Sequence, residues 1–508
     1  MRFTSLIVEL VRARPRLIFW VAVLFQAALW FILPVLLYAS PPGDLATVLA
    51  FGREYQLGTD LGPPLAFWLA DIAFRLAGGH MFGVYLLSQI CFAVTLWAVF
   101  TLGRAIVGGQ QAVLAALLTA TITAFSFPAV EFGPAVLACP LWALVLLHAW
   151  RVIGQRQHAA WFALSIEIGL LFLTTPVAIV LVLLLAAFAL ATAQGRRTLR
   201  SLNPLFEALV IGMLALPYLV WLLRSGTRLP LPVWGDPLMM LEGFGTLLAH
   251  LALGLAGIAI LVVANWKGFD RKAKAEDAPV IFRPPVEPLA RQFVCTFALA
   301  PALVLSLVSA WLGRDHVLGG EGVVLLMVGP AVVVAAGDLI HLRRQEVLRT
   351  IWLLAILAPV LLVLGTTFIQ PWIGNAEVRT LLPASTMGRF FGDNYRLRTN
   401  APLQAVAGDP QLAALVGIGA PTRPRVFFDA APERTPWLTA DKFAETGGLV
   451  VWRATDTVGA PPPELAARFP GLVPEVPRVF TPLVSGRQDA LRIGWGVVRP
   501  KGMAQGGK

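Results

Sequence analysis

The sequence predicts an all-α polytopic membrane bundle followed by a small α/β domain at its C-terminal end. Three observations support this prediction. Hydrophobic residues make up 57% of the 508 residues and charged residues only 14%, whereas a soluble domain has about 25% charged residues. Apolar runs of about the length that crosses a bilayer recur up to residue 370. Beyond that point the composition is that of an ordinary globular domain.

The first apolar run covers residues 17–38 and follows a basic N-terminal segment that ends at Arg16. This order resembles a signal peptide. The run is about 22 residues long, however, which exceeds the roughly 7–15 residues of a cleavable apolar region. We therefore expect an uncleaved first spanning helix.

Ten further apolar runs predict about eleven spanning helices in total. They cover residues 83–103, 110–127, 132–150, 159–174, 177–194, 205–223, 244–265, 293–312, 321–341 and 350–369. The pairs around Pro128 and Pro176 share one continuous stretch each, so a re-entrant hairpin is the alternative there. Either count is odd and leaves the two ends of the bundle on opposite sides.

Lysine and arginine are distributed unevenly between alternate connecting segments. The segments on the N-terminal side hold 19 of them and the opposite loops hold 5. The positive-inside rule then places the N-terminus in the cytoplasm and the C-terminal domain in the periplasm of a bacterial inner membrane. The net charge of +11 follows from the same bias. Because no basic patch is interleaved with aromatic residues, we do not expect nucleic-acid binding.

The predicted domains are a membrane domain over 1–370, a periplasmic soluble domain over 371–499 and a disordered tail over 500–508. The first outer loop, 39–82, is too long for a simple turn. Within it, Leu65, Trp68 and Ile72 recur at helical spacing after a Pro-Pro pair, while Asp71 and Arg75 fall on the other face. This pattern predicts a helix over 63–77 that lies in the outer membrane interface.

The C-terminal segment contains two short apolar runs that predict buried strands, at 425–428 and 448–452, and a helix over 409–416. It has no histidine, which excludes a Ser/His/Asp triad there. The three cysteines, Cys91, Cys139 and Cys295, lie in apolar runs, and we expect small buried hydrophobic side chains without a disulfide or metal pair. The chain also lacks Walker A, GxGxxG, HExxH and GxSxG motifs in their required contexts. No cofactor is expected, and a role for a divalent metal stays open.

Polar residues outside the bundle are the candidate site. In the first outer loop these are Asp44, Arg53, Glu54, Asp60 and Arg75. A carboxylate there can act as a general base for an acceptor hydroxyl. The structural alternatives are a helix cap for Asp44 and a turn for Asp60.

Three basic residues in later outer loops, Arg224, Arg314 and His316, are candidates for binding a lipid phosphate, with a solvated loop as the alternative. Two acidic residues, Glu131 and Glu167, lie within apolar runs. For Glu167 we expect pairing inside the bundle.

The order of these segments resembles the membrane glycosyltransferases of family 39, which include protein O-mannosyltransferases and the enzymes that add aminoarabinose or galacturonic acid to lipid A and core sugars. The resemblance rests on an early loop Asp, the Pro63-Pro64-Leu65 helix start, the helix that ends at Arg151 and the segment from Gly169 to Pro176. It implies the GT-C fold and an inverting transfer from a polyprenyl-phosphate sugar on the outer face. Asp44 stands where the family has its catalytic Asp.

Four positions depart from the family pattern. Leu45 replaces a Glu, Gly62 replaces a basic residue, Thr175 replaces a Lys, and an Asp is missing near Cys139. Three hypotheses follow. The first is a glycosyltransferase that acts on lipopolysaccharide or lipid A, a polysaccharide or a protein. The second is a catalytically degenerate scaffold or binding protein, and the third is a carrier of lipid-linked substrates.

Overall fold

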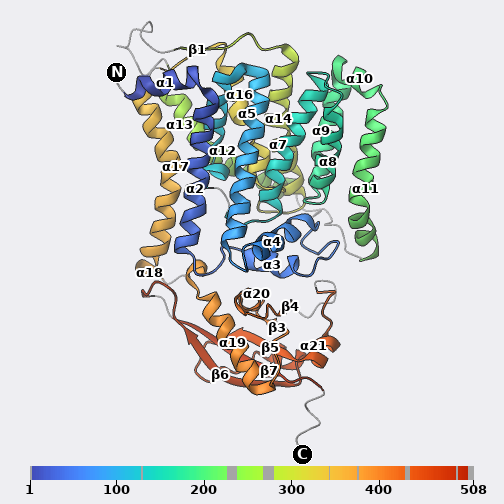
Figure 1. Cartoon of the computed structure of the whole chain (residues 1–508), viewed down its shortest axis with the longest axis vertical. Helices are drawn as coiled ribbons and strands as arrows, with labels where there is room; N and C mark the ends of the chain where they lie inside the picture. Colours follow the sequence, from blue (N-terminus) through green and yellow to red (C-terminus); the bar gives the residue numbers. More distant parts are fainter. Residues whose placement is uncertain are drawn as a thin grey trace, which may run out of the picture. The chain divides into compact units, whose positions relative to one another are not determined.

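The computed structural model describes residues 3–127, 130–225, 237–266, 280–342, 344–374, 377–428, 435–487 and 490–501 (Figure 1). Its internal contacts divide the chain into two units. The first unit is Met1–Ile32 with Leu86–Leu361, and the second is Leu33–Tyr85 with Leu362–Lys508. The first outer loop therefore shares a unit with the C-terminal residues, while the division predicted at residue 370 stays a prediction. Most of the predicted disordered tail, 502–508, lies outside the described residues.

The first unit is built from helices, the longest of which run roughly alongside one another (Figure 1). They are α1 (Phe3–Ala13), α2 (Pro15–Leu37), α5 (Phe82–Thr119), α6 (Thr123–Ser126), α7 (Pro134–Ile153), α8 (Ala160–Phe172), α9 (Ala178–Ala191), α10 (Ala193–Leu199), α11 (Asn203–Arg224), α12 (Pro237–Gly254), α13 (Ala256–Ala264), α14 (Pro288–Trp311), α15 (Glu321–Leu325), α16 (Val328–Ala336) and α17 (Gln345–Phe368). A short antiparallel pair joins β1 (Val280–Phe282) to β2 (Leu339–His341).

Seven of the described helices are long and apolar enough to cross a membrane: α2, α5, α7, α11, α12, α14 and α17. An eighth span arises if α9 and α10, which bend by 110° at their junction, are counted as one. The predicted multi-pass bundle is confirmed, but the count of about eleven spans is not. The sequence shows where apolar runs lie, and helix length within a run depends on where tertiary packing ends the helix.

Helix α5 shows how two predicted runs meet. It covers 83–103 and the first part of 110–127 as two helices that meet at a kink. Gly108 interrupts the helix with φ 78° and ψ 169°, a backbone conformation that is readily open only to glycine. Elsewhere, the runs 159–174 and 321–341 correspond to the shorter helices α8, α15 and α16.

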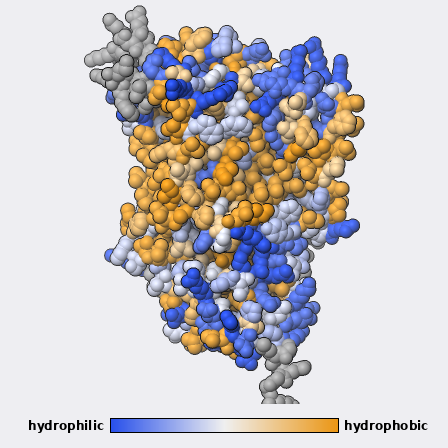
Figure 2. All heavy atoms as spheres, viewed as in Figure 1, coloured by the Kyte–Doolittle hydropathy of each residue, from blue (hydrophilic) through white to orange (hydrophobic). Residues whose placement is uncertain are grey.

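The first unit carries apolar side chains on its outside. Only 6% of the most apolar window of α11 and 17% of that of α17 is buried in the protein. Figure 2 shows apolar side chains gathered over these long helices. Leu223 is 84% exposed and Met213 is 68% exposed. Lipid is the solvent that suits such a surface, because an apolar area of this extent is unfavourable in water. The same outward packing leaves Cys295 exposed, so the expectation that it is buried is wrong.

The C-terminal part of the second unit is a small α/β domain, as predicted. Its helices are α18 (Gln370–Ile373), the 3-10 helix η3 (Arg379–Leu381), α19 (Ala384–Thr399), α20 (Pro410–Gly419), α21 (Ala440–Thr446) and α22 (Pro463–Arg468). Its strands are β3 (Ala405–Gly408), β4 (Arg425–Phe427), β5 (Gly448–Arg453), β6 (Leu472–Phe480) and β7 (Leu491–Val498).

These strands form one mixed sheet in the order β4-β3-β5-β7-β6. Strand β3 is parallel to both β4 and β5, and β7 is antiparallel to β5 and β6. The two predicted strands are β4 and β5, and the predicted helix is α20. Its cap is Asp409, whose carboxylate accepts hydrogen bonds of 3.0 Å from the backbone N–H groups of Gln411 and Leu412. This is the usual stabilisation of the first turn of a helix.

The first outer loop forms two helices, α3 (Leu45–Gly52) and α4 (Leu65–Leu76). Helix α4 lies within the predicted range 63–77. Its buried face is Ala66, Phe67, Ala70, Asp71 and Phe74, and the predicted apolar stripe lies on the other side, with Leu76 84% exposed. Asp71 lies opposite the apolar stripe, as predicted, and its face is the buried one. Helical periodicity shows two faces but not which one the rest of the protein covers.

Candidate functional site

The second unit brings the first outer loop and the C-terminal domain together. Helices α3 and α4 pack closely, because a Cβ atom on Gly52 would lie 2.2 Å from the backbone oxygen of Phe67. Only glycine permits this approach. Helix α20 of the C-terminal domain packs against α3. The candidate residues of the loop therefore meet side chains from the far end of the sequence.

Asp44 directly precedes α3 but makes no side-chain capping hydrogen bond to it. Its backbone, at φ −96° and ψ 12°, also differs from the extended conformation typical of a cap. The capping alternative is thus not what the structure shows. Asp44 lines a small pocket that is open to solvent.

The C-terminal domain supplies the polar wall of this pocket, with Arg379, Gln411 and Arg453. Both terminal nitrogens of Arg379 lie 3.1 Å from the amide oxygen of Gln411, in the orientation of the amide that satisfies its hydrogen bonds. Arg453 forms an ion pair with Glu377, and a hydrogen bond from this pair raises the pKa of Arg453. A carboxylate and two guanidinium groups thus border the same cavity.

The loop is also tied to this wall through its backbone. The N–H groups of Ala39 and Ser40 donate to the carbonyl of Thr380 at 2.8 and 3.1 Å. The hydroxyl of Ser40 donates to the carbonyl of Arg379. These hydrogen bonds fix the residues before Asp44 in position beside η3.

A second polar cluster surrounds Asp71, whose side chain is fully buried. Its carboxylate lies 2.6 Å from Nε of Arg75 and 2.8 Å from Nη2 of Arg423. The hydroxyl of Tyr55 donates to the same carboxylate at 2.9 Å. Three groups from three segments thus converge on one carboxylate.

Arg53 and Glu54 lie beside this cluster. Nε of Arg425 is 3.4 Å from the carboxylate of Glu54, whose side chain is only 5% exposed. Burial is the main cause of a raised pKa for Glu54 and of a lowered pKa for Arg53. Among the described residues, Nη1 of Arg53 and Oε1 of Glu54 have no hydrogen-bond partner.

The structure thus brings some of the predicted site residues close together, in two separate places. Arg53, Glu54 and Arg75 belong to the cluster around Asp71, and Asp44 belongs to the pocket. Asp60 is exposed in a tight turn that is closed by hydrogen bonds between Thr59 and Gly62, which fits the turn alternative.

The remaining candidates lie in the other unit. Arg224 is exposed in the last turn of α11, and Arg314 is exposed after α14. Nδ1 of His316 lies 2.6 Å from Asp315, and this hydrogen bond lowers the pKa of Asp315. The partly buried acid Glu167 has a partner, His148, at 2.8 Å.

Sequence reasoning missed the contributions of the C-terminal domain: Arg379, Gln411, Arg423, Arg425 and Arg453. Their one local signal is the pair of arginines at 423 and 425, at the start of β4, and such pairs are common on solvated surfaces. Among the described residues no group of three or more His, Cys, Asp or Glu side chains is placed to hold a metal ion.

Comparison with known proteins agrees with this architecture. A family model described as dolichyl-phosphate-mannose-protein mannosyltransferase matches residues 62–221. This match begins after Asp44 and ends before the C-terminal domain. No curated protein matches the chain by sequence.

Two crystal structures share the fold over almost the whole chain. ArnT from Cupriavidus metallidurans bound to undecaprenyl phosphate has a TM-score of 0.59 and 14% identity, covering 95% of this chain and 98% of that chain. The apo form of the same ArnT has a TM-score of 0.56 and 13% identity, covering 94% and 97%. The predicted resemblance to family 39 and the GT-C fold are confirmed. The family model covers less than half of the chain, and the likeness to ArnT concerns the fold.

Proposed function

We propose that the chain transfers a sugar from a polyprenyl-phosphate donor to an acceptor in the cell envelope, with inversion, on the periplasmic face of the inner membrane. The observation that carries the proposal is the position of Asp44. It lines a pocket with Arg379 and Arg453 instead of capping α3. A similar fold in an ArnT bound to undecaprenyl phosphate supports a donor of that class.

In a single displacement, an acceptor oxygen attacks the anomeric carbon from the side opposite the donor phosphate. The bond from that carbon to the phosphate oxygen breaks, and polyprenyl phosphate leaves with the electron pair. Asp44 accepts the acceptor's proton as general base, a contribution of roughly 100- to 10,000-fold to the rate. Where the acceptor is itself ionised, the carboxylate orients it instead.

Guanidinium groups suit the leaving phosphate, because they bind two of its oxygens at once. Arg53 and Arg75 of the first outer loop are the donor-binding candidates nearest to Asp44 in the sequence. Glu54 and Asp60 are further binding candidates in the same loop. Arg224, Arg314 and His316 of the first unit stay candidates by their sequence positions alone.

The membrane orientation in this proposal follows the charge bias of the connecting segments, with the N-terminus in the cytoplasm. The exposed apolar stripe of α4, which includes Ile72 and Leu76, then lies against the outer interface. A helix of this kind keeps its apolar side in lipid and its charged side toward protein and water.

The second candidate is a scaffold without catalysis. It is favoured by the four departures from the family pattern at Leu45, Gly62, Thr175 and the Cys139 region. A fold does not fix a function, and the site residues decide between the two candidates. The third candidate is a carrier of lipid-linked substrates. Such a carrier needs a polar path through the bilayer, and the apolar helices have few charged residues to form one.

The test is a transfer assay in membranes from a deletion strain that is complemented with wild type, Asp44→Asn or Asp441→Asn. Asp441 is exposed on α21 and serves as the matched control. Envelope lipids, polysaccharides and glycoproteins are then analysed by mass spectrometry. We expect one sugar to be lost on deletion and to return with wild type and Asp441→Asn but not with Asp44→Asn. An envelope unchanged by the deletion would point to the scaffold.

A further inference from the structure

Asp71 connects three segments of the second unit. Its fully buried carboxylate accepts hydrogen bonds from Arg75, one helical turn along α4, and from Tyr55 in the loop after α3. It forms an ion pair with Arg423 from the segment between α20 and β4. A buried carboxylate is stable only when it is paired and hydrogen-bonded. Each of the three partners therefore stabilises the placement of the other two.

The backbone shows that this convergence is imposed by the tertiary structure. Tyr55 and Arg423 have φ angles of 48° and 47°. Only four non-glycine residues of the described chain have a positive φ, and these two place their side chains on the same carboxylate. Left-handed backbone costs a non-glycine residue on the order of 1–2 kcal/mol, and such strain gathers at functional sites.

Arg423 also secures α4 by a second contact. Its guanidinium lies 4.6 Å from the centre of the Phe74 ring, an arrangement that attracts a cation to the face of the ring. The same side chain thus contacts both the charged residue and an aromatic residue on the buried face of α4.

The segment that follows Arg423 secures α3. Arg425 pairs with Glu54 at the end of α3. The ring of Phe428 stacks on that of Phe51, with centroids 5.1 Å apart and an interplanar angle of 13°. Residues 423–428 therefore contact both helices of the first outer loop, α3 and α4.

Asp71 is also in direct contact with the helix that follows Asp44. A Cβ atom at Gly52, the last residue of α3, would lie 3.2 Å from Cβ of Asp71. A shift of Asp71 would therefore disturb the packing of α3 on α4. Because Asp44 directly precedes α3, its position in the pocket depends on that packing.

We propose that Asp71 is a positioning residue for the transfer reaction. It binds Arg423 of the C-terminal domain, and through this contact the domain holds α3 and α4 in the arrangement that places Asp44 in its pocket. The effect on transfer rests on the proposed function. The effect on the order of α3 and α4 does not.

The experiment uses the full chain in lipid nanodiscs and has two readouts. Hydrogen exchange measured by mass spectrometry reports on peptides from 45–76 and, separately, on β5 and β7. Transfer is measured in complemented membranes as described above. The variants are Asp71→Asn, Tyr55→Phe, Arg423→Met and Arg423→Lys, with Arg389→Ala as an exposed control on α19.

We expect Asp71→Asn and Arg423→Met to speed exchange of the α3 and α4 peptides at least tenfold and to lower transfer ten- to hundredfold. Protection of β5 and β7 should stay unchanged. Tyr55→Phe removes one hydroxyl and should speed exchange and lower transfer by two- to fivefold each. This milder variant still tests the proposal if the Asp71→Asn protein does not accumulate. Arg423→Lys keeps the charge and should recover part of the protection.

Wild-type exchange at α3 and α4 in Arg423→Met and Tyr55→Phe would overturn the proposal, as would wild-type transfer in Asp71→Asn. Loss of protection throughout the C-terminal domain would also overturn it, because that outcome indicates general unfolding. If the wild-type chain itself transfers no sugar, the proposed function fails, and the exchange measurement still decides the role of Asp71.

Discussion

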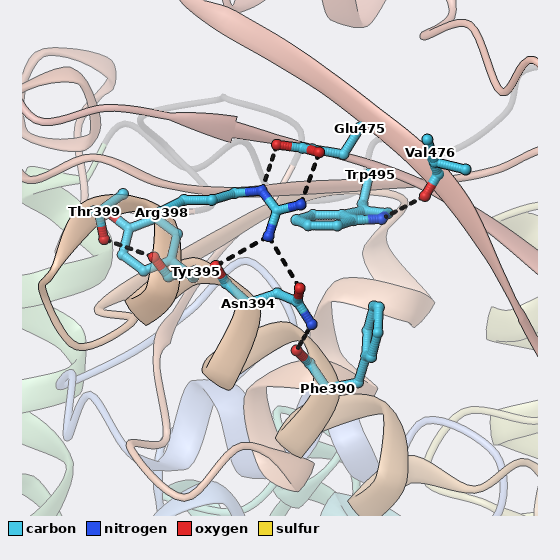
Figure 3. Close-up of polar contacts among 8 residues, drawn as sticks. All are labelled: Phe390, Asn394, Tyr395, Arg398, Thr399, Glu475, Val476 and Trp495. Atoms are coloured by element: carbon cyan, nitrogen blue, oxygen red, sulfur yellow. Dashed lines mark hydrogen bonds and ion pairs between the residues drawn. The ribbon is translucent and has the colours of Figure 1, made fainter.

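Arg398 of α19 binds Glu475 of β6 through two of its guanidinium nitrogens, one of them 2.8 Å from Oε2 (Figure 3). The same guanidinium lies 4.7 Å from the centre of the Trp495 ring and donates to the side chain of Asn394 at 2.9 Å. Glu475 thus ties a helix to the edge strand of the sheet, and Trp495 supports the pair from β7. Both charged side chains are partly buried, at 32% and 24% exposure.

The first prediction concerns the strength of this contact. Replacing Arg398 with alanine removes a two-point ion pair and a cation–π contact, and we expect the C-terminal domain to lose about 1–2 kcal/mol of stability. Hydrogen exchange of β6 and β7 peptides in the full chain measures the loss, and Arg389→Ala is the control. Exchange equal to that of wild type would show that the pair contributes nothing measurable.

The second prediction is a pH dependence. Hydrogen bonds from Arg398 hold the pKa of Glu475 below its ordinary value. A carboxyl whose folded-state pKa is depressed stabilises the fold above its unfolded pKa of about 4.3, and this stabilisation is lost as the pH falls through the folded value. Between pH 7 and pH 3, Glu475→Gln should therefore lose less stability than wild type. Parallel curves for the two proteins would contradict this.

The third prediction compares two glycines one helical turn apart on α19. A Cβ at Gly388 would lie 2.0 Å from the backbone of Gly419, whereas nothing lies within 4 Å of a Cβ at Gly392. Gly388→Ala should force α19 and α20 apart and destabilise the domain by about 3 kcal/mol or more. Gly392→Ala should stabilise it by about 0.5–1 kcal/mol, since alanine favours helix. Thermal unfolding of both variants checks this, and similar effects at the two sites would refute it.

The fourth prediction concerns the contact between His148 and Glu167 in the bundle. His148 of α7 lies 2.8 Å from Glu167 of α8, and Nη1 of Arg151 lies 3.0 Å from the other ring nitrogen. A double-mutant cycle with His148→Phe and Glu167→Leu should give a coupling energy of about 1 kcal/mol, within the range measured for hydrogen bonds between membrane helices. Unfolding in mixed micelles is the measurement. A coupling below about 0.3 kcal/mol would mean that the two residues act independently.

The fifth prediction concerns the pocket that contains Asp44. Arg379 contributes a guanidinium that Gln411 holds in place. Arg379→Gln should lower sugar transfer by about ten- to hundredfold, because charged hydrogen bonds to a phosphate or carboxylate are worth roughly 1.5–3 kcal/mol. The deletion-strain assay measures the effect, with Arg389→Ala as the control. Unreduced transfer would exclude Arg379 from substrate binding.

Much of the architecture follows from local features of the sequence. The length and recurrence of apolar runs predicted the bundle, because a chain in lipid must satisfy its backbone within each helix. The local patterns over 409–416 and 448–452 predicted α20 and β5, because helix formation and strand burial depend in part on a few adjacent residues. The early Asp and the Pro-Pro start of α4 indicated the family.

The tertiary structure decided which candidate residues meet. Periodicity placed Asp71 opposite the apolar stripe of α4, but it did not show that this face is buried and contacts Arg423 from the far end of the chain. The number of helices long enough to span also differs from the number of apolar runs, since a bend such as that at Gly108 depends on packing. The length of an apolar run can be read from adjacent residues, and the thickness of the bilayer sets the length that is needed to cross it. The convergence of charges depends on side chains hundreds of residues apart, and only the folded chain brings them within hydrogen-bonding distance.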